Sequence, residues 1–181
     1  MQHDLLARVV TALDVAGIPH MVTGSFASTF HGEPRMTRDI DLVIDPDTTT
    51  IALFVEQFEP EAFYIDNAAA TASRDMFNVI DVTTGWKVDL IIRKDRPFSL
   101  EEFGRRIPVV ISGVATFVAS VEDTILSKLE WSKTSGSEQQ LRDVNAMIQI
   151  QRPALDLDYL QRWATELGTV KQLQEALDAE A

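Results

Sequence analysis

The chain contains no cysteine among its 181 residues. A disulfide framework, a thiolate nucleophile and a zinc–thiolate centre are therefore excluded. Histidine is also rare, with only His3, His20 and His31, and their positions predict no metal site. We expect His31 to be a polar residue at the end of a short helix, with a position close to a bound phosphate as the alternative.

Long apolar runs are missing as well. No segment approaches the about 18–20 apolar residues that a membrane span needs, and residues 1–8 lack the basic start and apolar stretch of a signal peptide. We therefore expect no membrane partner and a cytoplasmic location. The apolar fraction of 45% is that of a globular protein, and the length suits one domain with a substantial core, with or without a helical appendage.

Basic residues are outnumbered, with 16 Lys and Arg against 28 Asp and Glu and a formal net charge of −12. This charge argues against broad, non-specific binding to nucleic acid. Six basic residues nevertheless gather in the middle of the chain and are called the middle basic cluster. They are either solvated surface charge or a rim that attracts a triphosphate or a polynucleotide end. The six are Lys87, Arg93, Lys94, Arg96, Arg105 and Arg106.

Two common catalytic motifs are absent. The chain has no Gly-x-Ser-x-Gly elbow of a serine hydrolase and no Gly-x-x-x-x-Gly-Lys phosphate loop. Neither a serine hydrolase nor a P-loop enzyme is therefore indicated.

The first two thirds of the chain alternate between helical and strand patterns. Apolar residues at helical spacing over 5–16 predict an amphipathic helix that Gly17 ends. Further helices are expected over 25–30, from a cap at 45–48 through Phe58, and over 99–103. Strands are expected over 20–23, 40–44, 63–65, 76–82, 86–92, 107–111 and 114–118, with 76–82 and 86–92 forming a hairpin.

From Ser120 onward every pattern is helical. Ser120 is expected to cap a helix that runs to Lys133, and further helices are expected over 137–151, 156–167 and 169–179. The sequence therefore predicts an α/β core over residues 1–118 and a helical C-terminal unit over residues 119–181 packed on that core.

Asp39 and Asp41 stand in a strand whose other residues are apolar. Side chains alternate across a strand, so both carboxylates point to one face while Ile40 and Leu42 point into the core. Two like charges on one face repel each other unless a cation lies between them, and Mg²⁺ is commonly held by carboxylates and substrate phosphates. The pair therefore predicts a Mg²⁺ site, with two surface aspartates on an edge strand as the alternative.

Two further features extend this site. Asp89 is an acid in the otherwise apolar run 88–92 and is the natural third carboxylate, able to complete a two-metal site or to act as the base for an acceptor hydroxyl. Gly24-Ser25 forms a turn into a helix, whose backbone N–H groups can bind a phosphate. Metal and phosphate together point to phosphoryl or nucleotidyl transfer.

In this order and spacing, Gly24-Ser25, Asp39-x-Asp41 and Asp89 resemble the nucleotidyltransferase superfamily with the polymerase-beta-like fold, over about residues 18–92. The resemblance implies an α+β fold with a mixed sheet flanked by helices. It also implies Mg²⁺-dependent transfer of a nucleoside monophosphate from a nucleoside triphosphate, such as ATP, to an acceptor hydroxyl. Asp39 and Asp41 would hold the metals and Asp89 a metal or the acceptor hydroxyl, while Gly24 and Ser25 would hold the triphosphate.

The later helices narrow the resemblance. Residues 123–133, followed by Arg142-Asp143-Val144, are similar to the helical part of the AbiEii and MenT type toxin nucleotidyltransferases. Residues 35–41 also resemble the Arg-x-Thr-x-Asp-x-Asp motif of that group. This similarity implies that Lys128 and Arg38 meet the triphosphate charge and that Asp143 assists catalysis or fixes Lys128. The alternative is a plain salt bridge between two helices.

The same resemblance implies an acceptor that is an RNA end (tRNA), a protein or a small molecule, and an antitoxin as partner. The chain departs from these toxins in having Thr23 before Gly24 where they often have a second glycine, and it is shorter than many of them. Trp131 is expected in the core or at an interface, with stacking on a base as the alternative.

Two functional hypotheses of different classes follow. The first is an Mg²⁺-dependent nucleotidyltransferase. The second is a non-catalytic nucleotide-binding or partner-binding module on the same fold, which would bind a triphosphate without turnover.

Overall fold

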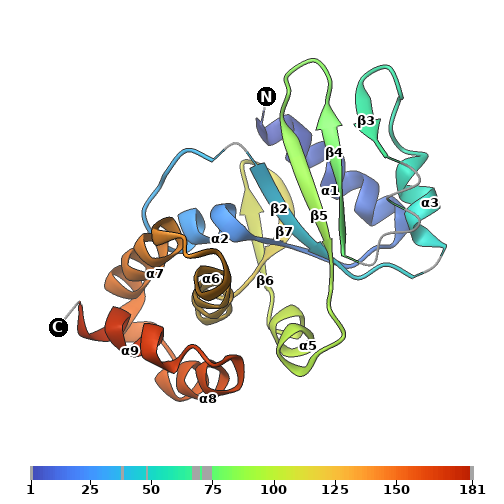
Figure 1. Ribbon diagram of the computed structural model, residues 1–181. Coiled ribbons are helices and arrows are strands. Elements are labelled where there is room, and N and C mark those ends of the chain that lie inside the picture. The colour runs from blue at the N-terminus through green and yellow to red at the C-terminus, as the bar shows by residue number, and fades with distance from the viewer. Residues whose placement is uncertain (1, 38, 48, 67–69, 71–74, 180–181) are drawn as a thin grey trace. The chain divides into compact units, whose positions relative to one another are not determined.

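The structure is a computed structural model that describes residues 2–37, 39–47, 49–66, 70 and 75–179 (Figure 1). Within these residues the fold is α+β, as predicted, with seven strands in one mixed sheet of order β3-β4-β5-β2-β1-β7-β6. The strands are β1 (His20–Thr23), β2 (Asp39–Ile44), β3 (Phe63–Ile65), β4 (Met76–Asp81), β5 (Lys87–Ile92), β6 (Ile107–Ile111) and β7 (Val114–Val118). The helices are α1 (Gln2–Ala16), α2 (Gly24–His31), α3 (Thr50–Val55), α5 (Pro97–Gly104), α6 (Val121–Ser135), α7 (Glu138–Gln151), η1 (Arg152–Ala154), α8 (Leu157–Leu167) and α9 (Val170–Asp178).

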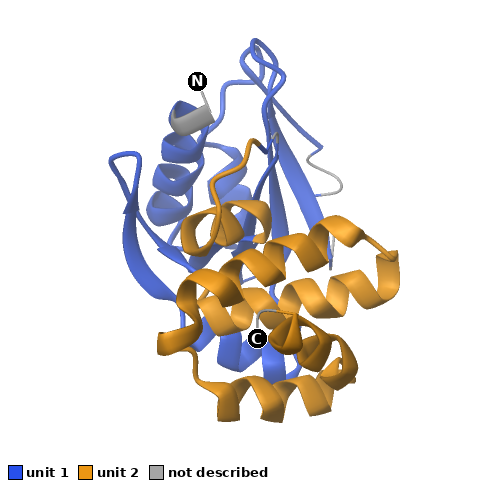
Figure 2. Ribbon diagram, turned by 90° about the vertical axis from the view of Figure 1, so that its left-hand side faces the viewer, with its two compact units in different colours: residues 1–23, 37–118 blue, residues 24–36, 119–181 orange. Residues whose placement is uncertain are grey.

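The chain divides into two compact units, coloured separately in Figure 2. Unit 1 comprises residues 1–23 and 37–118 and contains the whole sheet with α1, α3 and α5. Unit 2 comprises residues 24–36 and 119–181, so that α2 belongs with the C-terminal helices although it directly follows β1 in the chain. The domain boundary at residue 118 stays a prediction.

The core of unit 1 follows the apolar pattern of its sequence. The apolar residues of α1 at helical spacing are buried, and α1 packs against α3, β5 and β7. Gly17 ends the helix with a φ of 70°, a left-handed conformation that glycine adopts without strain. In β2, Ile40, Leu42 and Ile44 are fully buried, which confirms the predicted alternation along this strand.

The strands 76–81 and 87–92 pair antiparallel, which confirms the predicted hairpin. Asp81 closes its turn by accepting hydrogen bonds from the backbone N–H groups of Thr83 and Thr84. The helix predicted through Phe58 is shorter than expected, since α3 ends at Val55. The N–H groups of residues 57 and 58 bond to the carbonyls three residues earlier, so the chain continues as a turn of 3₁₀ type. This turn still buries Phe58.

Unit 2 is an assembly of helices in which α2 contacts both α6 and α7. Its helix ends lie close to the predicted ones because the capping residues are explicit in the sequence. Ser120 accepts from the N–H of Asp123 at the start of α6, and Asp156 accepts from the N–H of Tyr159 at the start of α8. No helix in the described part of the chain is long and apolar enough to span a membrane.

Candidate functional site

The polar residues of unit 1 meet on one face of the sheet, where β2 and β5 run parallel. In register, Asp39 pairs with Lys87 and Asp41 pairs with Asp89. The neighbouring strands extend the second pair into a row, because Thr23 of β1 lies opposite Asp41 and Asn78 of β4 lies opposite Asp89. Residues opposite one another in a sheet share a face, so the structure places the three predicted carboxylates on one face of the sheet.

The three carboxylates differ in exposure. The Asp39 side chain is 53% exposed, whereas Asp89 is buried with only 8% of its surface exposed. Val88 and Leu90 on the opposite face of β5 are fully buried, so β5 is covered on both faces at this point. Asp89 is therefore buried although it lies on the face of β5 opposite to Val88 and Leu90.

A lysine lies between these carboxylates. Lys87 Nζ is 2.8 Å from Asp89 Oδ2 and 3.8 Å from Asp39 Oδ1. The hydrogen bond to Asp89 raises the pKa of Lys87, which therefore carries its charge at neutral pH. The sequence analysis assigned Lys87 to the middle basic cluster. Its spacing of two residues before Asp89 on one strand was the signal that both share a face.

Asp89 has one further property. Its Oδ1 atom is buried and has no hydrogen-bond partner in the described part of the chain. The described residues also contain no group of three or more His, Asp or Glu side chains close enough to bind a metal ion together. The carboxylates are thus arranged around the Lys87 ammonium, with one buried oxygen unsatisfied.

Unit 2 contains a second polar cluster, centred on Asp143 of α7. Lys128 Nζ of α6 donates to Asp143 Oδ2 over 2.8 Å, and both side chains are buried. Arg35 donates to both oxygens of Asp143 over 3.1 Å. Ser28 and Gln139 donate to Asp143 over 3.3 Å and 2.8 Å. Lys128 and Asp143 therefore form an ion pair within a larger network. This contact agrees both with a plain salt bridge and with Asp143 fixing Lys128, so the functional role stays a prediction.

The electrostatics of this network favour the charged forms. Burial raises the pKa of Asp143, but the hydrogen bonds from Lys128 and Arg35 outweigh burial and hold the pKa below its usual value. Two cations thus converge on one buried carboxylate. In the sequence, Arg35 is the arginine of the Arg-x-Thr-x-Asp-x-Asp motif, with no predicted contact to Asp143, and nothing pointed to Ser28 or Gln139.

Gly24 and Ser25 begin α2 in unit 2. Gly24 has a φ of 61°, a left-handed conformation that costs other residues energy. Ser25 Oγ accepts a hydrogen bond from Arg35 Nη2 over 2.6 Å. Arg35 therefore links Ser25 to Asp143, so that Ser25, Arg35, Lys128 and Asp143 form one connected set. Arg38 lies outside the described residues.

The middle basic cluster is divided among local contacts. Arg93 pairs with Asp45 over 3.0 Å, and the Arg106 guanidinium lies 4.5 Å and 4.9 Å from the ring centroids of Phe103 and Phe117. Together with the Lys87–Asp89 pair, these contacts favour a structural role for at least half of the cluster.

Two other residues singled out by the sequence are also located. His31 is buried, and its Nε2 lies 2.7 Å from the carbonyl oxygen of Ala119, which supports the structural interpretation. Trp131 was expected in the core or at an interface. It is 62% exposed, so the core position is wrong, while an interface position stays a prediction. It lies three residues after Lys128 on α6, on the same side of the helix.

No protein-family model matches the sequence, and no curated protein matches it. Solved structures do match. The antibiotic-resistance factor ANT(2'')-Ia aligns over 98% of this chain and 97% of its own, with 12% identity and a TM-score of 0.62. A nucleotidyltransferase-like antigenic protein from Paracoccidioides brasiliensis aligns over 97% of this chain and 92% of its own, with 21% identity and a TM-score of 0.58. The lincosamide antibiotic adenylyltransferase LnuA, solved with lincomycin bound, aligns over 80% of this chain and 95% of its own, with 12% identity and a TM-score of 0.55. These similarities confirm the predicted nucleotidyltransferase fold.

Proposed function

Because the chain has the fold of nucleotidyltransferases, we propose that it is an Mg²⁺-dependent nucleotidyltransferase. It would transfer a nucleoside monophosphate from a nucleoside triphosphate to an acceptor hydroxyl. The observation that carries this proposal is the set of three carboxylates on one face of β2 and β5, with the buried Asp89 Oδ1 unsatisfied.

The donor atoms of this set fit Mg²⁺. Asp39, Asp41 and Asp89 supply only carboxylate oxygens, the hard ligands that Mg²⁺ prefers. A buried oxygen without a partner costs about 1–3 kcal/mol, and a cation beside Asp89 Oδ1 would relieve that cost. The bound ion would neutralise phosphate charge and polarise the reacting groups. Lys87 holds the same carboxylates, so binding of the ion requires its ammonium to move away from Asp89.

The polar cluster of unit 2 supplies groups suited to the triphosphate. Lys128 and Arg35 are cations held by one carboxylate, and Lys and Arg are the usual phosphate-binding side chains. In this proposal Lys128, Arg35 and Arg38 neutralise the phosphates, Ser25 and the Gly24 turn bind phosphate oxygens, and Asp143 fixes the two cations that it contacts. Asp143 is thus a positioning residue.

The proposed reaction is a substitution at the α-phosphorus. The acceptor oxygen forms a bond to this phosphorus, the bond from the phosphorus to the α–β bridging oxygen breaks, and pyrophosphate leaves. The hydroxyl proton passes to a base. Asp89 is either that base or a third metal ligand, and Asp89→Asn distinguishes the two roles. Loss of turnover with unchanged Mg²⁺ affinity indicates a base, whereas loss of both indicates a ligand.

The acceptor is proposed to be a small molecule. A net charge of −12 disfavours a polyanionic acceptor, and one structural neighbour is an adenylyltransferase of lincosamide antibiotics. An RNA end, including tRNA, or a protein hydroxyl are the other candidates from the sequence. The toxin role and an antitoxin partner stay predictions, tested by whether expression of the protein arrests growth in a manner that Asp41→Asn abolishes.

The transfer is tested with two labelled substrates in parallel. The protein, Mg²⁺ and acceptors (lincomycin, tobramycin and total RNA) are incubated with ATP or GTP carrying ³²P at either the α or the γ position. Nucleotidyl transfer moves the α label to the acceptor and leaves the γ label in pyrophosphate. Asp41→Asn should abolish transfer, and Asp45→Asn is the matched control, since Asp45 directly follows the other end of β2 and pairs with Arg93. Transfer of the γ label, or equal transfer by Asp41→Asn, would contradict the proposal.

The non-catalytic module is the competing hypothesis. It predicts a thermal shift with Mg²⁺ and triphosphate but no transfer of label to any acceptor. The buried Asp89 Oδ1 argues against it, because the Lys87 ammonium contacts the other oxygen of Asp89 and leaves this one without a partner in the described residues.

A further inference from the structure

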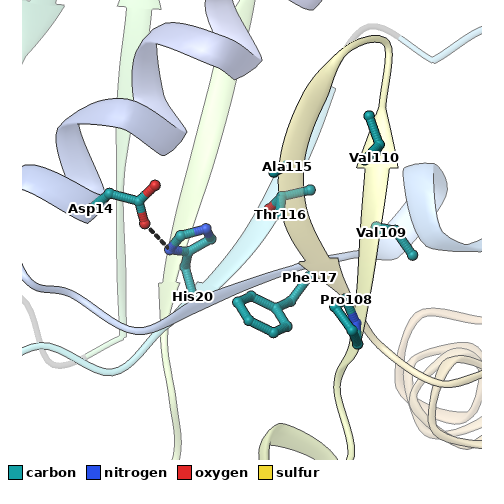
Figure 3. Close-up of a pocket in the computed structure, with 8 residues that line it drawn as sticks. All are labelled: Asp14, His20, Pro108, Val109, Val110, Ala115, Thr116 and Phe117. Carbon is teal, nitrogen blue, oxygen red and sulfur yellow. Dashed lines mark ion pairs between the residues drawn. The ribbon is translucent and has the colours of Figure 1, made fainter.

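A cavity of about 540 Å³ lies within unit 1, beside the hairpin formed by β6 and β7. Its wall consists of Asp14 from α1, His20 from β1 and the hairpin residues 108–110 and 115–117 (Figure 3). This volume falls within the range of about 300–1,000 Å³ of small-molecule sites. Most of the wall is apolar, with Pro, Val, Ala and Phe side chains.

The two polar side chains of the cavity wall come from neighbouring strands. β1 and β7 run parallel and pair at Val22 and Val118, and His20 and Thr116 each lie two residues earlier on their strands. The His20 ring lies edge-on to Phe117, the residue after Thr116, with ring centroids 6.3 Å apart. His20 and Thr116 are both buried, with 4% and 5% of their surface exposed.

His20 has a defined hydrogen-bonding state. Its Nδ1 lies 3.2 Å from the carbonyl oxygen of Ile18 and 3.9 Å from Asp14 Oδ1. Both neighbours are acceptors, so Nδ1 carries the proton. Burial lowers the pKa of His20 and outweighs Asp14 and the Ile18 carbonyl, so the ring is neutral at pH 7. The lone pair of Nε2 is therefore an acceptor, and Figure 3 shows this nitrogen turned away from Asp14, on the side of the hairpin.

Both polar atoms lack partners. His20 Nε2 and Thr116 Oγ1 are buried and accept or donate no hydrogen bond in the described residues. Buried polar atoms are normally satisfied by protein, water or ligand. Two unsatisfied atoms in the wall of one apolar cavity indicate that a bound molecule completes them.

We propose that this cavity binds a small neutral molecule with an apolar body and a hydrogen-bond donor, which donates to His20 Nε2 and contacts the Thr116 hydroxyl. The neutral imidazole requires a donor. Asp14 and Arg106 act on His20 with opposite charges, so the surroundings favour neither an anion nor a cation. The cavity is separate from the proposed nucleotide site. Thr23 lies opposite Asp41, and His20 lies three residues earlier on β1, which is about 10 Å along the strand.

The test uses probe pairs that differ only in the donor: indole and 1-methylindole, and phenol and anisole. Binding is measured by ligand-observed NMR at millimolar concentrations. The donor-bearing probe of each pair should bind about fivefold more tightly, the contribution of one neutral hydrogen bond. The three histidines of the chain allow a direct second readout: in the ¹⁵N spectrum of the histidine rings, Nε2 of His20 should shift with indole and not with 1-methylindole.

Three variants complete the test. Ala115→Phe fills the cavity from an exposed position and should abolish binding, and Thr116→Val should weaken it severalfold. Thr169→Val is the matched control, because its hydroxyl is equally buried and unpartnered but belongs to unit 2. Equal affinity of the two probes within each pair, or the absence of saturable binding, would overturn the proposal. Indole binding that Ala115→Phe leaves intact would also overturn it. A dimer of the protein that only Ala115→Phe disrupts would show that a second copy of the chain, and no small molecule, covers the cavity.

Discussion

Replacement of Asp143 by alanine tests the polar cluster of unit 2. The substitution removes one carboxylate from two cations at once, Lys128 at 2.8 Å and Arg35 at 3.1 Å. Breaking a buried ion pair by removing one partner costs about 3–5 kcal/mol. Arg35 is 31% exposed and recovers part of its hydration, so the buried Lys128 accounts for most of the expected loss.

Lys128→Met should cost less than Asp143→Ala. Asp143 keeps the fork of Arg35 when Lys128 is removed. The variant loses the hydrogen bonds of Lys128 to Asp143 and Gln140, and the charged one to Asp143 is worth about 1.5–3 kcal/mol. The double variant Lys128→Met/Asp143→Ala should be more stable than Asp143→Ala alone, because it no longer buries an uncompensated ammonium.

The free energy of unfolding is measured by urea titration with tryptophan fluorescence. A Trp86→Phe background leaves Trp131 and Trp163, both in unit 2, as the reporters. Lys171→Gln is the control, since its ion pair with Glu175 in unit 2 is exposed and should be worth less than about 1 kcal/mol. The reasoning would be refuted if Asp143→Ala lowered the free energy of unfolding by less than about 1 kcal/mol. It would also be refuted if the double variant were less stable than Asp143→Ala.

Two further predictions concern Lys87 and pH. Lys87→Met removes the ammonium that competes for Asp89. Lys87 is one-third exposed, and an ion pair that solvent reaches is worth about 1 kcal/mol, so the Mg²⁺ concentration for half-maximal nucleotide binding should fall about fivefold. Unchanged or weaker Mg²⁺ dependence, measured by calorimetry, would argue against this competition. Burial lowers the pKa of both His20 and His31, so they favour the folded state above the unfolded histidine pKa of about 6.5, and stability should decline as pH falls below that value. Because the pKa of Asp143 is lowered in the folded state, this carboxylate adds a further loss of stability only when the pH falls below its ordinary pKa of 3.8. Urea midpoints at pH 8, 7, 6 and 5 check this order, and a midpoint that rises on acidification contradicts it.

Much of the fold followed from local sequence signals. Caps such as Ser120 and Asp156, and the alternation of apolar residues in β2, fixed element positions to within one or two residues. The exception is α3, where apolar periodicity continued past Val55 although the backbone had already turned. Periodicity reports which residues are buried, and a turn can bury Phe58 as well as a helix can.

The carboxylates of β2 and β5 were predictable because acids in apolar strands are costly. The shared face of Lys87 and Asp89 follows from their spacing of two residues. The position of Lys87 opposite Asp39 could not be predicted, since strand order and register depend on long-range pairing that one sequence does not specify. For the same reason the partners of Asp143 could not be predicted. Arg35 and Ser28 lie more than 100 residues away from it in the chain, and α2 packs with helices that follow the entire sheet in sequence.

The central claim is that Asp39, Asp41 and Asp89 form the metal site of a nucleotide-transfer enzyme. Its most direct test is the Mg²⁺ dependence of binding of an ATP analogue that cannot be cleaved between the α and β phosphates, measured by calorimetry for the wild type, Asp41→Asn and the Asp45→Asn control. The account predicts that Mg²⁺ tightens binding at least about tenfold, or 1.4 kcal/mol, in the wild type and the control but not in Asp41→Asn. Equal tightening in all three proteins would contradict it.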